Sequence, residues 1–300
     1  MGSLEGRVAV VTGAGRGLGR EHALLLAAEG AKVVVNDPGV GGDGQGTDAG
    51  PAHDVVAEIT AAGGQAVADT GYANDFTAAK ALIDRAVDTF GDLHVLVNNA
   101  GITHDATLVK MTEAAWDSVI SVHLKGHFAT LHHAAAHWRK RAKEAGAPVS
   151  ASVVNTSSGS GLRGSPGQLN YAAAKAGIAA MTVVAARELE RYGVRVNAIA
   201  PVARTRMTLE TPGLAARLAA REGEFDRWDP ANISPVVAWL ATEECTANAQ
   251  MLMVRGGRID VYDGWTVRET HQHEGRWSLD GLRTALGGLP TAPPTLDPAA

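Results

Sequence analysis

A tyrosine and a lysine four residues apart, Tyr171 and Lys175, are the side chains best suited to acid and base chemistry in this sequence. On a helix this spacing places both side chains on one face, at adjacent turns. A nearby ammonium lowers the pKa of a phenol from its usual value of about 10, so Tyr171 could exchange a proton with the oxygen of an alcohol or a ketone. Ser158 lies thirteen residues before Tyr171, after an expected strand, and could donate a hydrogen bond to the same oxygen. A tyrosine and a lysine at this spacing often arise by chance, so the pattern becomes specific only with Ser158 and a nucleotide-binding loop.

A glycine-rich segment, TGAGRGLG at residues 12–19, joins an expected strand to an expected helix. Glycine permits a tight turn and a close approach of the backbone to a diphosphate, and free N–H groups at the start of the helix would stabilise its charge. The strand before the segment and the helix after it favour a dinucleotide site over an ordinary glycine-rich turn. The residues of this loop that we expect to bind the dinucleotide are Gly13, Arg16, Gly17, Leu18 and Gly19.

Asp37, eighteen residues beyond Gly19 at the end of the second expected strand, favours NAD over NADP as the cofactor. A carboxylate there can accept hydrogen bonds from the adenosine ribose hydroxyls and would repel a 2′-phosphate. Arg16 argues the other way, because a guanidinium in the glycine loop could bind that phosphate. Alternatively, Arg16 is solvated or pairs with Asp37.

Strands and helices alternate along the chain, as they must to bring these residues together. Near-continuous runs of Val, Ile and Leu in the strands are typical of a parallel sheet covered on both faces. No linker or break in composition interrupts the alternation, so we expect one α/β domain with a doubly wound parallel sheet. The expected strands are 8–11, 31–35, 65–68, 95–97, 152–156 and 195–199, and the expected helices are 21–29, 51–62, 76–90, 113–141 and 171–192.

Three stretches depart from the alternation. Residues 39–46 form a glycine-rich insertion, expected to be a mobile surface loop. Residues 204–232 follow the end of a strand, where a lid over the site would lie. The tail from residue 287 is rich in Pro, Ala and Gly and is expected to be disordered. We therefore expect one domain over residues 1–286.

The composition limits the possible partners. With 45% hydrophobic and 20% charged residues and a net charge of -5, the chain shows no footprint of a nucleic-acid or anionic-membrane partner. Cys245 is the only cysteine, which excludes an internal disulfide and fits a reducing compartment. The first residues lack the apolar core of a signal peptide, and we expect no apolar run of membrane-spanning length. These features predict a cytoplasmic protein that binds neither nucleic acid nor membrane.

With these motifs, the chain from Leu4 to Met253 resembles the short-chain dehydrogenase/reductase family. The resemblance implies a Rossmann-type fold and transfer of a hydride between the nicotinamide ring and the substrate carbon. In that family pattern Ser158 orients the substrate oxygen and Tyr171 exchanges its proton. By the same pattern Lys175 would also bind the nicotinamide ribose, and the positive charge of the nicotinamide would add to the lowering of the Tyr171 pKa.

The resemblance also assigns roles outside the catalytic trio. Asn99 and Gly101, in the NNAG string at residues 98–101, would support the sheet and contact the adenosine side. Thr205, which follows the Pro201 that matches the family, would join the cofactor-binding residues. The pair expected to contact adenine falls on Tyr72 and Ala73, with Asp69 as a rival.

One position departs from the family pattern. His123 stands where many members have an Asn that takes part in a proton relay, and a His there could help to position a water. The chain most resembles one subgroup, the (3R)-hydroxyacyl-CoA dehydrogenase part of peroxisomal multifunctional enzyme type 2, which also acts on 17β-hydroxysteroids. Three features carry this resemblance: His123, the Val-Asn-Asp strand end with its glycine-rich insertion, and the string Arg206-Met207-Thr208.

We therefore expect an NAD-dependent enzyme that oxidises a secondary alcohol, with a 3-hydroxyacyl-CoA or a 17β-hydroxysteroid as substrate. A sugar, a terpene alcohol or a ketoacyl carrier protein is the alternative substrate, and a non-catalytic NAD-binding sensor or scaffold is the alternative from another class. The resemblance implies a homodimer or homotetramer. The histidines at 127, 132, 133 and 137 lack the HExxH arrangement, so we expect no metal.

Overall fold

The computed structural model describes residues 2–44, 46–205, 209, 218–220, 223–264, 266–267 and 269–289. By its internal contacts the chain divides into two units, Met1–Tyr262 and Asp263–Ala300. The first unit holds every element of the expected fold. The second holds the short helix α11, Leu279–Leu286. The limit expected at residue 286 stays a prediction, and most of the tail expected to be disordered lies outside the described residues.

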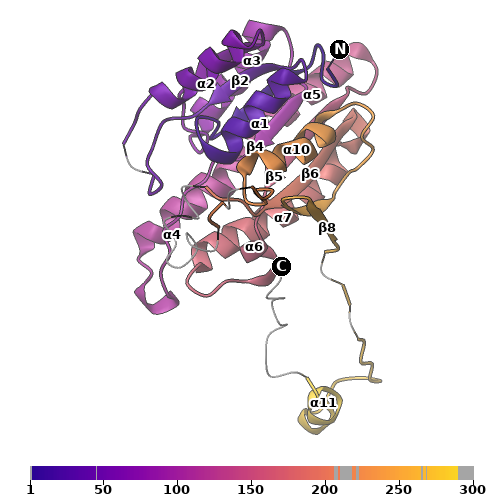
Figure 1. The fold of residues 1–300 in the computed structure, drawn as a ribbon. Helices are drawn as coiled ribbons and strands as arrows, with labels where there is room; N and C mark the ends of the chain where they lie inside the picture. Colours follow the sequence, from indigo (N-terminus) through magenta and orange to yellow (C-terminus); the bar gives the residue numbers. More distant parts are fainter. Residues whose placement is uncertain are drawn as a thin grey trace. The chain divides into compact units, whose positions relative to one another are not determined.

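One sheet of eight strands forms the centre of the first unit (Figure 1), in the order β3-β2-β1-β4-β5-β6-β7-β8. The strands from β1 to β7 pair in parallel, and β8 pairs with β7 in the antiparallel sense. The chain order reverses between β1 and β4, so the expected doubly wound parallel fold is confirmed. The strands are β1 Val8–Thr12, β2 Lys32–Asn36, β3 Gln65–Asp69, β4 Val95–Asn98, β5 Ala151–Thr156, β6 Val194–Pro201, β7 Met251–Arg255 and β8 Arg258–Tyr262.

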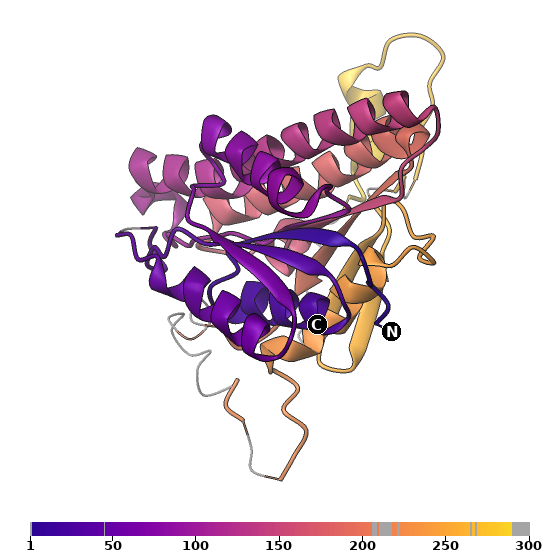
Figure 2. The same cartoon turned by 90° about the horizontal axis from the view of Figure 1, so that it is seen from above.

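Helices cover both faces of this sheet (Figure 2), because successive strand residues point to opposite sides. Val33 and Val35 of β2 pack into one apolar cluster with α1, α2 and α10, whereas Val34 packs into the other with α3, α5 and α7. Among the described residues, the helices that form these two clusters with the sheet are α1 Gly17–Ala28, α2 Gly50–Ala61, α3 Phe76–Phe90, α5 Gly126–Ala145, α7 Leu169–Leu189 and α10 Ser234–Ala241. The other helical segments described in this unit are η1 Leu108–Lys110, α4 Glu113–Ile120, η2 Ser121–Lys125, α6 Gly159–Arg163, η3 Glu190–Tyr192 and η4 Pro230–Ile233.

Two helical segments differ from the sequence-based expectation. The single helix expected over residues 113–141 is α4 and α5 joined by η2, a π-turn at Ser121–Lys125. The expectation of no run of membrane-spanning length was wrong, because Leu169–Tyr192 is long and apolar enough by length and composition. This segment is α7 and η3, and its buried Ala185, Ala186 and Leu189 belong to the apolar cluster that packs on the sheet.

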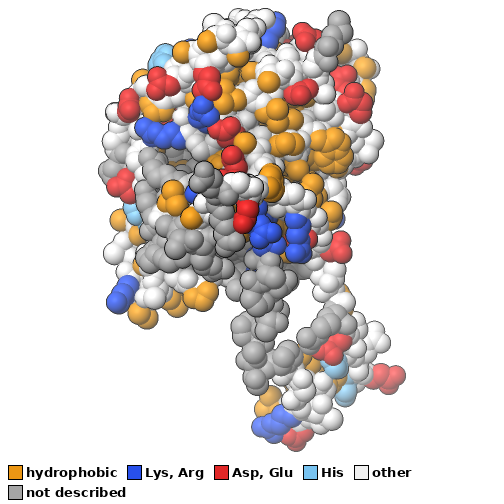
Figure 3. All heavy atoms as spheres, in the orientation of Figure 1, with side chains coloured by type: hydrophobic (Ala, Val, Ile, Leu, Met, Phe, Trp, Pro, Cys, Tyr) orange, Lys and Arg blue, Asp and Glu red, His pale blue; other side chains and the backbone are white. Residues whose placement is uncertain are grey.

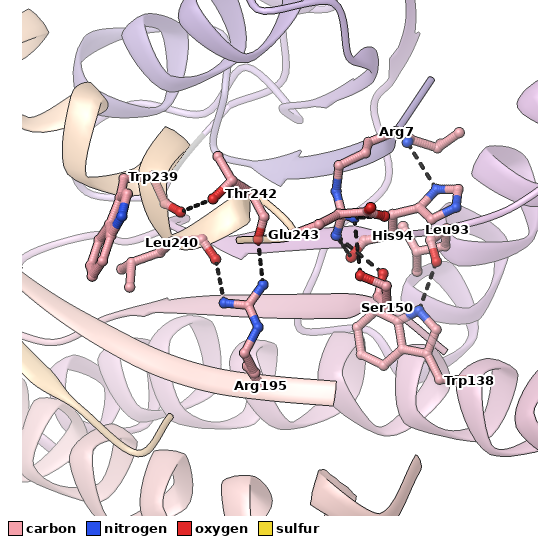
Figure 4. A network of polar contacts seen from close by, with 11 residues as sticks. Arg7, Leu93, His94, Trp138, Ser150, Arg195, Trp239, Leu240, Thr242 and Glu243 are labelled. Atoms are coloured by element: carbon pink, nitrogen blue, oxygen red, sulfur yellow. Dashed lines mark hydrogen bonds and ion pairs between the residues drawn. The ribbon is translucent and has the colours of Figure 1, made fainter. Parts of the chain in front are cut away.

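Polar contacts tie the amino edge of the sheet together (Figure 4). The buried Arg7 guanidinium bonds Glu243 at 3.0 Å and the Ser150 carbonyl at 3.2 Å. Arg195 donates to the Leu240 and Thr242 carbonyls at 3.0 and 2.6 Å, at the end of α10. These contacts fix β1, β5 and β6 relative to α10 at the edge opposite the catalytic residues.

Candidate active site

The predicted site residues follow the carboxyl ends of neighbouring strands. The glycine loop follows β1, Asn99 follows β4, Ser158 follows β5 and Thr205 follows β6. Parallel strands end at one edge of the sheet, so these four groups meet there. The reversal of strand order between β1 and β4 opens the crevice in which ligands of this kind of sheet bind.

The glycine loop is shaped so that side chains would fill or distort it. A Cβ at Gly13, where φ is 64°, would lie 2.7 Å from Ala100 Cα, and one at Gly19 would lie 2.2 Å from the Gly13 carbonyl oxygen. A Cβ at Gly17 would meet only the Thr205 methyl, at 3.8 Å. The loop is therefore closed on the side of the sheet and open at the first turn of α1, as a cradle for a diphosphate requires.

Asn99 holds this cradle against β4. Its Nδ2 donates to the carbonyls of Thr12 and Gly13 at 3.0 and 3.1 Å. The backbone N–H groups of Asn99 and Ala100 both donate to Thr12 Oγ1, at 3.0 and 3.1 Å. Four hydrogen bonds thus connect the loops after β1 and β4.

Asp37 lies directly beside the glycine loop. Its buried carboxylate accepts from the backbone N–H of Gly15 at 2.8 Å and of Gly39 at 2.7 Å. Each carboxylate oxygen has a second lone pair, which a ribose hydroxyl could use. Arg16 does not pair with Asp37, because its guanidinium bonds the Val40 carbonyl at 3.4 Å and lies 3.8 Å from Asp48.

The glycine-rich insertion is held against the loop that follows β4. Thr103 N–H donates to the Gly42 carbonyl at 3.3 Å, and His104 Nε2 lies 2.8 Å from the Asp43 carbonyl. The insertion therefore links the Asp37 side of the crevice to residues beside the catalytic helix.

The three candidates for adenine contact differ in their surroundings. Ala73 is buried and Tyr72 is 43% exposed. The Asp69 carboxylate already accepts from Asn36 Nδ2 at 2.8 Å and from Arg85 Nε at 3.0 Å. Asp69 therefore stabilises the end of β3.

Ser158, Tyr171 and Lys175 converge as the sequence predicts. Ser158 caps α6 and accepts from the Ser160 N–H at 3.2 Å. Its side chain is close enough to the Tyr171 phenol to lower the phenol pKa. Lys175 Nζ lies 5.4 Å from the centre of the Tyr171 ring and donates to the Thr156 carbonyl at 2.6 Å. The arrangement places an acid/base phenol, a hydrogen-bond donor and a buried amine around one point.

Burial sets the pKa values of this pair, in opposite directions. It lowers the pKa of Lys175 to about 7. Burial raises the pKa of Tyr171, and the charge of Asp105 raises it further. The interaction with Ser158 lowers the pKa of Tyr171 but does not reverse the effect of burial. In the protein alone, burial therefore has the largest effect on the phenol pKa. The expected lowering of that pKa by Lys175 together with a positively charged nicotinamide stays a prediction.

His123 lies in the π-turn and contacts the loop after β4 and the ring of Tyr171. Its Nε2 lies 2.7 Å from the Ile102 carbonyl and 3.1 Å from the Ile102 nitrogen. Its ring stands edge-on to Tyr171 at 5.1 Å. A Cβ at Gly101 would lie 2.3 Å from the His123 ring, so only glycine fits at 101. Burial and the Lys175 charge hold the pKa of His123 well below 6.5, so it acts as a neutral group.

A second set of polar residues, which the sequence analysis did not identify, borders Ser158 and Tyr171. Gln168 donates to Asp105 at 2.9 Å and accepts from Ser160 Oγ at 2.7 Å. Asn170 Nδ2 donates to the His104 carbonyl at 3.1 Å. These contacts join the loops after β4 and β5, and only the position of Gln168 three residues before Tyr171 could have pointed to them.

The expected lid is described in part. Arg204 pairs with Asp226 and donates to the Leu218 carbonyl at 2.8 Å, and its N–H donates to the Trp228 carbonyl at 2.6 Å. The two ends of the segment are thereby tied together next to Thr205. The string at residues 206–208 lies outside the described residues.

The histidines of α5 do not gather around one point. His127 is buried, and His133 contacts the Phe76 ring at 4.3 Å. His137 bonds Asp92 at 2.8 Å. Among the residues that the structure describes, no group of three His, Cys, Asp or Glu side chains could hold a metal ion.

Comparison with known proteins agrees with this geometry. A family profile described as short chain dehydrogenase matches residues 7–212. Hydroxyacyl-CoA dehydrogenase ChsB1 of Mycobacterium tuberculosis is 46% identical over 284 residues, 93% of this chain and 84% of that protein. Peroxisomal multifunctional enzyme type 2 of Drosophila melanogaster is 42% identical over 282 residues, 94% of this chain and 42% of that protein. The crystal structure of a short chain dehydrogenase from Mycobacterium avium matches with a TM-score of 0.85 at 51% identity, covering 96% of each chain.

Proposed function

The chain belongs to the short-chain dehydrogenase family, and from this premise we propose that it oxidises a 3-hydroxyacyl-CoA to the 3-ketoacyl-CoA with NAD. Membership makes it an oxidoreductase that acts on CH–OH groups. The thioester is supported by the similarity over 93% of the chain to a protein named hydroxyacyl-CoA dehydrogenase. The intact trio of Ser158, Tyr171 and Lys175 is the observation that carries the proposal.

The residues of the chain provide the proton chemistry. In oxidation Tyr171 takes the hydroxyl proton of the substrate, and Ser158 donates a hydrogen bond to the same oxygen. A protonated Lys175, 5.4 Å from the ring, favours the phenolate form of Tyr171. The glycine loop would hold the diphosphate of the cofactor, and the nicotinamide ring would supply the hydride acceptor beside Ser158 and Tyr171.

The charge at the end of β2 supports NAD as the cofactor. Asp37 places a carboxylate beside the glycine loop, where it would accept from ribose hydroxyls and repel a 2′-phosphate. Arg16 faces the insertion, where it contacts Val40 and Asp48. It therefore does not neutralise Asp37.

Exposed apolar side chains support assembly into a homodimer or homotetramer. Phe128 on α5 is 48% exposed and Val184 on α7 is 54% exposed. These two helices lie on the same face of the sheet. Burying such side chains against a second copy would remove apolar surface from water.

The direct test is the appearance of NADH with (3R)- and (3S)-3-hydroxyacyl-CoA thioesters and 17β-estradiol, with NADP in parallel. We expect turnover of a thioester with NAD only. Tyr171→Phe should abolish turnover while NAD binding, measured by calorimetry, stays within about twofold. Turnover of the steroid alone, or equal use of NADP, would contradict the substrate or the cofactor assignment respectively.

A further inference from the structure

Three arginines lie in or beside the turn between β7 and β8: Arg255, Arg258 and Arg227. Arg255 ends β7 and Arg258 begins β8, and the two stand directly opposite each other in the antiparallel pair. A Cβ at Gly256, where φ is 51°, would lie 3.0 Å from the Arg227 carbonyl oxygen and 3.1 Å from its Cβ. Glycine at 256 therefore lets the Arg227 backbone pack on the turn. Basic side chains gather on the surface near β8 (Figure 3).

The described residues of the protein balance the charge of this cluster only in part. Like charges directly opposite each other on paired strands destabilise the pair. Arg258 pairs with Asp260 at 2.8 Å. Within the part of the chain that the structure describes, Arg227 and Arg255 form no ion pair, and the Arg227 guanidinium lies 5.7 Å from the centre of the Trp228 ring. An anion bound beside Arg255 and Arg258 would reduce the repulsion between these two paired positions.

The position of the cluster relates it to the substrate. Because β7 is parallel to β6, its end lies at the same edge of the sheet as Ser158. The turn is next to the base of the lid, where Arg204 bonds the Trp228 carbonyl. In the strand order, Asp37 on β2 and the cluster on β7 and β8 lie on opposite sides of β4 and β5. The cluster is therefore far from the adenosine site and within two or three strand spacings of roughly 4.8 Å of Ser158.

We propose that Arg227, Arg255 and Arg258 bind the phosphate groups of the CoA part of the substrate. Guanidinium groups form charge-assisted, often bidentate hydrogen bonds with phosphate. The extended pantetheine arm would pass from Ser158 along the lid base to this turn. This proposal rests on the proposed thioester substrate. It places the adenosine of NAD and the nucleotide of CoA at opposite halves of the sheet.

The kinetic test compares thioesters of one 3-hydroxyacyl group with CoA, with 3′-dephospho-CoA and with N-acetylcysteamine, which has no phosphate. For Arg227→Gln/Arg255→Gln we expect KM for the CoA thioester to rise about tenfold, with kcat unchanged, since partly screened phosphate contacts are lost. KM for the N-acetylcysteamine thioester should not change. The matched control is Arg191→Gln. Arg191 is an exposed arginine whose guanidinium lies 4.8 Å from the centre of the neighbouring Tyr192 ring. It precedes β6 and therefore lies at the edge of the sheet opposite the turn between β7 and β8.

A binding measurement separates this proposal from the proposed function. Free CoA is titrated into wild type and the double variant by calorimetry at saturating NAD, so that the adenosine site is filled. We expect about tenfold weaker binding to the double variant and no change for Arg191→Gln. If the wild type and the Arg227→Gln/Arg255→Gln variant turn over CoA thioesters with equal KM, the phosphate site is overturned while the proposed function stands. Tight CoA binding that the double variant loses, without turnover of any thioester, would refute the function and keep the phosphate site.

Discussion

Burial decides the protonation states of the Tyr171 phenol and the Lys175 amine at neutral pH. Lys175 is 2% exposed and its pKa falls to about 7, so a large share of the amine is uncharged. The pKa of Tyr171 rises, so the phenol keeps its proton. A neutral phenol can protonate the oxygen of a ketone during reduction, whereas oxidation needs the phenolate. We therefore expect alcohol oxidation to gain with rising pH.

The charge of Asp105 gives a residue-level prediction. Its carboxylate raises the pKa of Tyr171, so Asp105→Asn should lower that pKa. The pH at which kcat/KM for alcohol oxidation reaches half its maximum should then move down by a few tenths of a unit, because Asp105 is exposed and screened. The asparagine can still accept from Gln168.

The matched control is Asp105→Glu, which keeps the charge and should leave the pH profile in place. The measurement is kcat/KM against pH at low and at high salt, where screening should shrink the shift. An upward shift, or the same shift in both variants, would show that Asp105 acts through loop structure and not through its charge.

The π-turn shows how an element adapts to a functional residue. A regular α-helix would run unbroken over residues 113–145. At Ser121–Lys125, however, the chain forms a π-helical turn, whose backbone hydrogen bonds join residues five apart. π-turns occur mostly as single turns within α-helices, frequently at functional sites. Here the turn carries the His123 ring to the Ile102 backbone and to the edge of Tyr171. The histidine thereby fixes the loop after β4 beside the catalytic helix.

The junction of β1 and α1 gives an element-level prediction. A Cβ at Gly19 would lie 2.2 Å from the Gly13 carbonyl oxygen and 2.5 Å from Asn99 Nδ2. Gly19→Ala must therefore displace the start of α1 and break the Asn99 bonds. Overpacking of this kind costs about 1–3 kcal/mol, so we expect NAD binding to weaken by about tenfold or more.

Gly257→Ala is the control for this variant, because nothing lies within 4 Å of its Cβ position. NAD affinity is measured by fluorescence or calorimetry, and folding by thermal melting. An unchanged affinity in Gly19→Ala would mean that the glycine loop does not form the dinucleotide cradle.

At the scale of the whole molecule, buried neutral histidines should make the fold sensitive to acid. His22 joins α1 to Ser234 at the start of α10 by a 2.8 Å bond, and burial lowers its pKa to about 3. Burial lowers the pKa of His127 to about 3 as well. Between pH 6.5 and 3 the unfolded chain binds protons at these sites and the folded chain does not. The free energy of unfolding must therefore fall with pH across this window, by about 1.4 kcal/mol per unit for each histidine.

The variant His22→Asn tests this relation. It keeps a polar partner for Ser234 but cannot titrate, so its free energy of unfolding should fall less steeply between pH 6 and 4.5. The difference in slope should approach 1.4 kcal/mol per pH unit. Urea unfolding at several pH values measures the slopes, and parallel curves for the two proteins would refute the role of His22.

Local spacing in the sequence was enough to place the candidate catalytic residues on their elements. Tyr171 and Lys175 lie four apart on one helix, and the glycine loop lies between a strand and a helix, so each motif is formed by neighbours in the chain. The alternation of apolar strands and helices likewise predicted six of the eight strands and the parallel sheet. The pair β7 and β8 was missed because β8 has a short, half-exposed pattern and follows a tight turn.

Tertiary structure alone decided what depends on contacts between distant segments. The pKa directions of Tyr171 and Lys175 follow from how deeply the whole domain buries them. The contacts of Asp105 with Gln168, and of Arg227 with the turn at Gly256, join residues far apart in the sequence. No spacing along the chain encodes such contacts, because they exist only once the sheet has set the order of its strands.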